Sequence, residues 1–151
     1  EMIKDDWFVY DQAIVDQLES NLIDMIRNLV SDLKKEYRDV YLIRNEETIN
    51  KLKLYEFDKV DDDVFHYQGF MPDFLLYLND GEETYQLFIE PKGDQLLVRD
   101  NWKEKLLEKI KPENIKLIGE DEKIKLYGVK FFRYGNGREI EEELMSYTID
   151  N

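Results

Sequence analysis

Two apolar runs joined by a short turn constrain the fold of this 151-residue chain more than any other feature. The runs are "DFLLYL" (73–78) and "TYQLFIE" (84–90), and "NDGEE" (79–83) separates them. Apolar runs on either side of an Asp-Gly turn are typical of an antiparallel hairpin. If the turn centres near Gly81, paired residues have numbers that sum to about 163. This register places Asp73 opposite Glu90, give or take one position.

Three charged side chains stand where the two predicted strands end: Asp73, Glu90 and Lys92. Opposed carboxylates repel each other across a strand pair, and side-chain alternation puts Glu90 and Lys92 on one face. Pro91 has no N–H, so it favours a strand end or bulge and frees a carbonyl oxygen there. Such oxygen groups suit Mg²⁺, which is typically held by one or two carboxylates plus substrate phosphates. The residues alone leave two interpretations open: a metal site, or a surface salt bridge in which Lys92 neutralises Glu90.

Helical and strand patterns alternate along the chain, which predicts one α/β domain over residues 1–151. We expect a mixed central sheet flanked by helices. Asp11 is a candidate N-cap for the first helix, and Asn101 with Glu104 forms a candidate capping box for the second. The acidic run 58–63 is expected to be a solvated loop. Helices are predicted at about 12–38, 101–111 and 138–149, and strands at 40–45, 51–57, 73–78, 85–90, 115–119 and 123–134.

The formal net charge of −14 disfavours a nucleic-acid partner at first sight, but the charge is uneven. Residues 92–116 hold seven basic and five acidic residues, whereas the rest of the chain has a net charge of −16. The basic residues on the second helix, with one arginine before it, either contact phosphates or form an ordinary solvated face, since Glu104 and Glu108 interleave with them. These residues are Arg99, Lys103, Lys105, Lys109 and Lys111.

The absence of cysteine excludes disulfides and thiolate metal sites. No apolar run approaches the roughly 20 residues of a membrane span, and the N-terminal sequence is no signal peptide. We therefore expect a cytoplasmic protein without a membrane partner. His66 is the one candidate for histidine-based catalysis, and Trp102 is expected to pack in the core with Leu106 and Ile110.

Pro72-Asp73 followed by Glu90-Pro91-Lys92 resembles the PD-(D/E)XK nuclease signature. A longer series of segments, over about residues 10–110, resembles the C-terminal endonuclease domain of the restriction subunit of type III restriction enzymes. The segments are "YDQAIVDQLESNLIDMI", "VYLIRNEE", "KLKLYEFD", "GFMPDFLLYL", "YQLFIEPKGDQLL" and "DNWKEKLLEKI", in this order. Arg44, Asn45 and Glu46 match this pattern without an assigned role.

The resemblance implies a restriction-endonuclease-like fold and Mg²⁺-dependent cleavage of double-stranded DNA, with Mn²⁺ as a possible substitute. It implies Asp73 and Glu90 as metal ligands, joined by the Pro91 carbonyl that the strand-end argument supplies. Lys92 would position the attacking water. An acid on the first helix would complete the catalytic site: Glu19 matches best, and Asp16 lies one turn away. The other interpretation of Glu19 is an exposed helical glutamate.

Type III restriction subunits also carry an ATP-driven motor with a phosphate-binding loop. This chain has no G-x-x-x-x-G-K-[ST] motif and is too short to hold such a motor. We expect the nuclease domain of a larger helicase–nuclease protein, in which ATP acts only through the motor and a modification (methyltransferase) subunit is a partner. The alternative is a catalytically idle DNA-binding or protein-interaction module on a nuclease-like fold.

Overall fold

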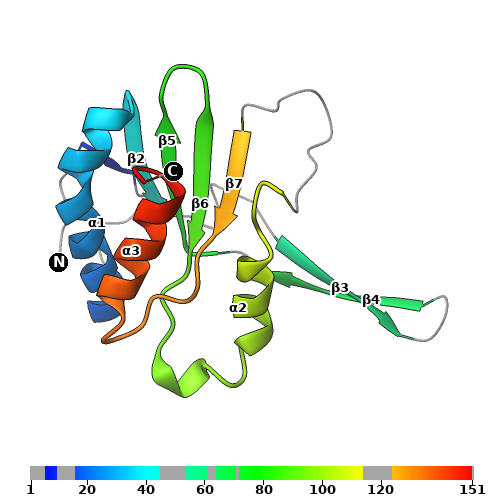
Figure 1. The fold of residues 1–151 in the computed structure, drawn as a ribbon. Helices are drawn as coiled ribbons and strands as arrows, with labels where there is room; N and C mark the ends of the chain where they lie inside the picture. The colour runs from blue at the N-terminus through cyan, green and yellow to red at the C-terminus, as the bar shows by residue number, and fades with distance from the viewer. Residues whose placement is uncertain are drawn as a thin grey trace.

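The computed structural model describes residues 6–9, 16–44, 54–60, 64–70, 72–113 and 124–150, with only the backbone of 9, 54–60 and 64–70. Its centre is a mixed sheet of five strands in the order β1–β2–β5–β6–β7 (Figure 1). Neighbours β2, β5 and β6 pair antiparallel, whereas the outer pairs β1–β2 and β6–β7 are parallel. The strands are β1 (Phe8–Val9), β2 (Asp39–Arg44), β5 (Phe74–Asn79), β6 (Thr84–Ile89) and β7 (Ile124–Gly128).

Helices cover both faces of this sheet, because its central strands are apolar on both sides. Helices α1 (Gln17–Glu36) and α3 (Gly137–Tyr147) pack on one face, in a core that includes Leu76 and Leu87. Helix α2 (Asn101–Glu108) packs on the other face, with a smaller core around Phe88. The predicted α/β architecture, a mixed sheet flanked by helices, is confirmed.

The β5–β6 hairpin has the register that the turn predicts. Phe74 pairs with Ile89 and Asn79 with Thr84, so paired numbers sum to 163. The Asp80 carboxylate accepts hydrogen bonds from the backbone N–H groups of Glu82 and Glu83. Gly81 has a φ of +101°, a conformation that glycine adopts without strain. This tight turn fixes which residues meet at the far end of the hairpin.

Helix α1 begins later than its apolar periodicity predicts. The predicted start near residue 12, with Asp11 as N-cap, is wrong, because the helix begins at Gln17 and Asp16 is its N-cap. The Asp16 carboxylate accepts from the Glu19 N–H, and the Glu19 carboxylate accepts from the Asp16 N–H. This reciprocal capping box satisfies backbone donors that the first turn leaves unpaired.

Helix α2 is also capped differently from the prediction. Its N-cap is Asp100, not Asn101, and no side chain caps its first turn. The Glu104 carboxylate accepts instead from the N–H of Phe131, at 2.9 Å. The Glu104 carboxylate, which the sequence pattern assigned to helix capping, is therefore used for a tertiary contact.

Several strand boundaries differ from the predicted ones. Strand β3 (Leu54–Val60) includes residues 58–60 of the acidic run that was expected to be a loop, and 61–63 lie outside the described residues. It pairs with β4 (Val64–Phe70), which the patterns did not predict, in a separate two-stranded sheet (Figure 1). The strand predicted at 123–134 is shorter, since β7 ends at Gly128. The strand predicted at 115–119 lies outside the described residues.

Candidate functional site

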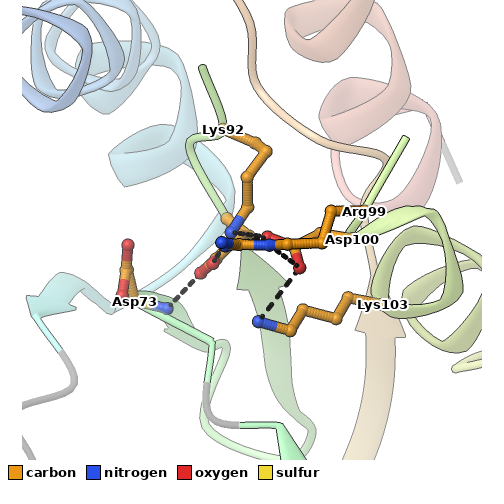
Figure 2. A network of polar contacts seen from close by, with 6 residues as sticks. Asp73, Lys92, Arg99, Asp100 and Lys103 are labelled. Carbon is orange, nitrogen blue, oxygen red and sulfur yellow. Dashed lines mark hydrogen bonds and ion pairs between the residues drawn. The ribbon is translucent and has the colours of Figure 1, made fainter. Parts of the chain in front are cut away.

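The base of the β5–β6 hairpin brings Asp73 and Glu90 together. Asp73 directly precedes β5 and Glu90 directly follows β6, so the ladder that pairs Phe74 with Ile89 has them as its next position. The backbone N–H of Asp73 donates to Glu90 Oε1 at 2.8 Å (Figure 2). The Glu90 side chain is buried. The structure thus brings together the two acids that the turn register pairs.

Pro91 separates Glu90 from Lys92 at the point where β6 ends. It forms an isolated parallel bridge with Phe132. The Phe132 N–H donates to the Glu90 carbonyl, and the Lys92 N–H donates to the Phe132 carbonyl, both at 2.9 Å. A parallel bridge uses the backbone groups on either side of the bridged residue, so proline at this position removes no bond. The strand end predicted from Pro91 is confirmed, and both charged neighbours are anchored to one residue.

The Lys92 ammonium lies between two carboxylates. Its Nζ is 3.3 Å from Glu90 Oε2 and 2.9 Å from Asp100 Oδ2. Asp100 is 3% exposed and also binds the Arg99 guanidinium, with Lys103 Nζ 3.7 Å away. Figure 2 shows Lys92, Arg99 and Lys103 converging on Asp100 from different directions. The ion pair of Lys92 with Glu90 is therefore present, but its expected position at the surface is wrong, because Lys92 is buried and has Asp100 as a second partner.

The first turn of α1 supplies two more acids to the site. Glu19 is buried, so the interpretation as a merely exposed helical glutamate is wrong. One of its oxygens completes the capping box with Asp16, and the other is 3.1 Å from Arg44 Nη2. Arg44 is the last residue of β2 and pairs in register with Phe74, the neighbour of Asp73. A role thus emerges for Arg44: it neutralises Glu19 beside Asp73.

Burial and like charge shift the pKa values of the hairpin acids upward. Burial, followed by the charge of Glu19, raises the pKa of Asp73 to about 6. Burial, followed by the charge of Asp73, raises the pKa of Glu90 to about 7. Both carboxylates are thus destabilised in their charged form, and a cation placed between them would relieve this cost.

The cations of the site have the opposite environment. Burial lowers the pKa of Lys92, but hydrogen bonds from Lys92 to Asp100 and Glu90 outweigh it, and the net shift is upward. The pKa of Asp100 is held well below its usual range, first by Arg99 and then by Lys92. Lys92 and Asp100 therefore form a stable ionic pair beside two acids whose pKa values are raised.

A pocket of about 430 Å³ opens between these elements. Acidic residues from α1 and the hairpin lie on its wall, and so does Lys92. Tyr134, which is 54% exposed, also lines it. The lining residues are Asp16, Leu18, Glu19, Asp73, Pro91, Lys92, Gly93, Gln95, Leu96 and Tyr134.

The donor set of this pocket fits a hard divalent cation in part. Within the part of the chain that the structure describes, no three Asp, Glu or His side chains are grouped to hold a metal ion. Asp73 and Pro91 line this pocket, whereas Glu90 is buried beside Asp73 and contacts the Asp73 N–H and the Lys92 ammonium. Mg²⁺ often needs no more from a protein, since waters and substrate phosphates complete its coordination. Asp73 is thus the carboxylate through which this pocket could hold Mg²⁺ jointly with a phosphate, with Glu90 next to it as a second carboxylate.

The other candidate residues lie outside this arrangement or pack elsewhere. Lys111 donates to the Gly128 carbonyl and lies over the Tyr147 ring, so for this lysine a structural role replaces phosphate contact. Trp102 packs against the core beside α2, as predicted. His66 belongs to β4, whose side chains are not described, and residues 45–46 lie outside the described ranges. No helix among the described residues is long and apolar enough to cross a membrane.

Comparison with known proteins places the chain in a family. A family model described as the HI_1054_C C-terminal domain matches residues 2–150. The chain belongs to the HI_1054_C family. A protein of Haemophilus influenzae, described as an uncharacterized protein, is 37% identical over 161 aligned positions, which cover 97% of this chain and 33% of the relative. The chain thus spans about a third of that relative's length, and no solved structure matches it.

Asp100 is the site residue of this HI_1054_C domain that sequence reasoning missed. It stands between Asp94 and Glu104 in a charged segment, where nothing marks one acid as different from the next. The one available signal is its two basic neighbours, Arg99 and Lys103, at spacings of one and three. Its burial against Lys92 depends on how the segment after β6 folds back, which spacing does not reveal.

Proposed function

We propose that this HI_1054_C domain is a Mg²⁺-dependent endonuclease domain of the PD-(D/E)XK type that hydrolyses phosphodiester bonds of DNA. One observation carries the proposal: the hairpin register sets Asp73 beside Glu90, Lys92 contacts Glu90, and Asp73 and Lys92 line one pocket. The raised pKa values of both acids support it, because two buried carboxylates at one site are costly without a cation. The mixed sheet flanked by helices is compatible with a restriction-endonuclease-like fold.

The proposed roles follow from the chemistry of each side chain. Asp73 and Glu90 would hold Mg²⁺, with the Pro91 carbonyl as a further ligand, and Mn²⁺ would substitute. When bound, the ion supplies Lewis-acid stabilisation of the phosphate and neutralises the carboxylate pair. The Lys92 ammonium donates hydrogen bonds, so it would orient the attacking water and stabilise charge that develops on a phosphate oxygen. Glu19, held by Arg44, would take the remaining acidic position at the pocket wall.

The wider setting that we propose is a type III restriction system. The relative from Haemophilus influenzae is about three times as long as the part aligned with this chain, which leaves room for further domains in such a protein. An ATP-driven motor and a modification subunit would deliver double-stranded DNA to the site. ATP would act through the motor alone, since the chain has no phosphate-binding loop motif.

Cleavage by the longer parent protein tests this proposal. Supercoiled and linear DNA are incubated with this longer protein, ATP and Mg²⁺. The variants Asp73→Asn, Glu90→Gln and Lys92→Met are compared with the unsubstituted protein. Each substitution should abolish cleavage, because the groups act as one unit. Asp94→Asn is the matched control, since Asp94 is an exposed acid of the segment that follows Lys92. Cleavage that persists in all three variants would exclude this site, and metal-independent DNA binding without cleavage would favour the idle binding module.

A further inference from the structure

We propose that Asp100 is a positioning residue that holds the Lys92 ammonium in place and presents Arg99 to a DNA phosphate. Through Asp100, the catalytic pocket would be linked to an exposed cation next to it. The inference rests on the proposed nuclease function for its consequence. Its structural claim, that Asp100 fixes Lys92, stands on contacts that need no substrate.

Burial makes Asp100 unusual among the acids of the α2 segment. Its side chain is 4% exposed, and a carboxylate that leaves water at this depth must be compensated by charge or hydrogen bonds. Oδ2 receives Lys92 at 2.9 Å and Arg99 Nη2 at 3.1 Å, and Oδ1 receives Arg99 Nε at 3.1 Å. Both oxygens are thus occupied by protein cations. Asp100 is suited to orienting Lys92 rather than to binding a metal itself.

Glu90 alone cannot hold Lys92 in the proposed reaction. Its carboxylate accepts from the Asp73 N–H and from Lys92, and a metal ion would require one or both of the same oxygens. A lysine side chain with one weakened partner regains rotamer freedom, which costs positioning. Asp100 contacts Lys92 more closely than Glu90 does, at 2.9 Å against 3.3 Å, and it lies outside the proposed ligand set. Asp100 would therefore keep the Lys92 ammonium in place when the Glu90 carboxylate coordinates a metal ion.

The Asp100 carboxylate also orients the guanidinium of Arg99. Its guanidinium binds Asp100 through two nitrogens, a geometry that fixes the plane of the group. The Arg99 side chain nevertheless remains 68% exposed, so the face turned away from Asp100 is accessible to solvent. A planar guanidinium held in one orientation at the surface is a good donor to a phosphate oxygen. Asp100 would thereby align one surface phosphate contact with the lysine of the pocket.

Nitrogen-15 NMR of the lysine ammonium groups in this chain, without metal or DNA, tests the positioning claim. A lysine ammonium gives a resolved signal only when hydrogen bonds slow its exchange with water. We expect such a signal from Lys92, assigned by its loss in Lys92→Met. In Asp100→Asn, which keeps the side-chain size, the signal should shift and its exchange with water should speed up, because Glu90 is then the one acidic partner left among the described residues. Asp94→Asn should leave the signal unchanged. A Lys92 signal that is the same in Asp100→Asn as in the parent would overturn the proposal.

Two further variants keep the test decisive. If Asp100→Asn does not fold, Asp100→Glu retains the charge but moves the carboxylate by one methylene, which should shift the Lys92 signal and speed its exchange. An unshifted signal in this variant would also overturn the proposal. Arg99→Gln should leave the Lys92 signal in place and weaken the binding of a DNA duplex in Ca²⁺, with a smaller salt dependence. Duplex binding unchanged by Arg99→Gln would remove the phosphate-presenting role.

Failure of this inference is separable from failure of the proposed function. The NMR readout concerns a contact within the metal-free protein, and cleavage by the parent protein concerns the chemistry. A parent that does not cut DNA, with a Lys92 signal that depends on Asp100, would end the nuclease proposal and leave the positioning claim supported. The reverse pair of results would retain the nuclease and reject the role of Asp100.

Discussion

The two hairpin acids make the stability of this protein depend on pH in an unusual direction. Ordinary carboxyls titrate near pH 4, whereas burial raises the pKa of Asp73 to about 6 and that of Glu90 to about 7. The folded state therefore binds protons more tightly than the unfolded state between about pH 4 and 7. Stability falls as pH rises through this window, since the folded protein must release protons that it binds well.

A comparison of the unsubstituted 151-residue chain with its Glu90→Gln variant tests the direction of this pH dependence. Urea unfolding at about pH 5 and about pH 7.5 should show a loss of stability that is larger for the unsubstituted chain than for the variant, by on the order of 1–2 kcal/mol, because Asp73 still titrates in the variant. The difference between the two proteins isolates the site from the general repulsion of a chain with a net charge of −14. Mg²⁺ should recover stability at the higher pH in the parent and less in the variant. Equal pH dependence in both proteins would contradict the burial argument.

Substitution of Asp16 should lower stability, whereas substitution of Glu19 should abolish cleavage. Asp16 is the N-cap of α1, so Asp16→Ala should lower the free energy of unfolding by about 1 kcal/mol. Glu19→Gln retains a side chain that completes a capping box and removes only the charge that pairs with Arg44. We expect Asp16→Ala to retain cleavage by the parent protein and Glu19→Gln to lose it. If Asp16→Ala loses cleavage and Glu19→Gln keeps it, our assignment of Glu19 as the catalytic acid of the helix is wrong.

At the scale of elements, local patterns predicted the hairpin better than the helix ends. A short turn sets the register of its strands, so the pairing of Asp73 with Glu90 followed from counting residues. Helix ends depend on which acid the backbone uses as a cap. Asp11 and Asp16 are equivalent candidates by residue type, and the choice of Asp16 coincides with the contact between Glu19 and Arg44 of a distant strand. Long-range contacts of this kind do not appear in local periodicity.

The site residues on the hairpin were likewise predictable from the sequence, whereas those that reach the site from other elements were not. Asp73, Glu90 and Lys92 lie close along one hairpin, where alternation and register apply directly. Asp100 enters the site through the segment after β6 and Arg44 through the pairing of β2 with β5, and neither follows from spacing. The shortened β7 has a similar cause, since the chain bends after Gly128 to reach the bridge between Phe132 and Pro91.

The contact between β7 and α2 depends on Gly128. A Cβ at this position would lie 1.9 Å from the Leu107 carbonyl oxygen, which belongs to the backbone and cannot move aside as a flexible side chain would. Gly128→Ala should therefore force α2 away from the sheet and destabilise the protein by about 1–3 kcal/mol, as overpacking does. Gly137→Ala is the matched control, because its Cβ would meet the Phe132 ring at an ordinary 3.7 Å. Urea unfolding of the two variants measures the difference, and equal stability would contradict the close approach.

At the scale of the whole molecule, charge limits what this domain does alone. The chain carries 35 acidic and 21 basic residues, and the described cations near the site are largely committed to acids. Arg99 is the most exposed of the cations that bind Asp100. Affinity for DNA grows with the number of phosphates that a protein neutralises. Few such contacts are available here, so delivery of DNA to the pocket would belong to other parts of a longer protein.

The binding of DNA by this chain should accordingly be weak, salt-sensitive and indifferent to sequence. A labelled duplex titrated in Ca²⁺ should bind at low salt and lose most of its affinity near physiological ionic strength, because exposed charges are then screened beyond about 8 Å. A second duplex of unrelated sequence should bind equally, since no base-reading motif stands out in the chain. The longer parent protein, tested with the same duplexes, should bind tightly at physiological salt. Tight and sequence-selective binding by this chain alone would show that the domain reads DNA itself, and the delivery model would then be wrong.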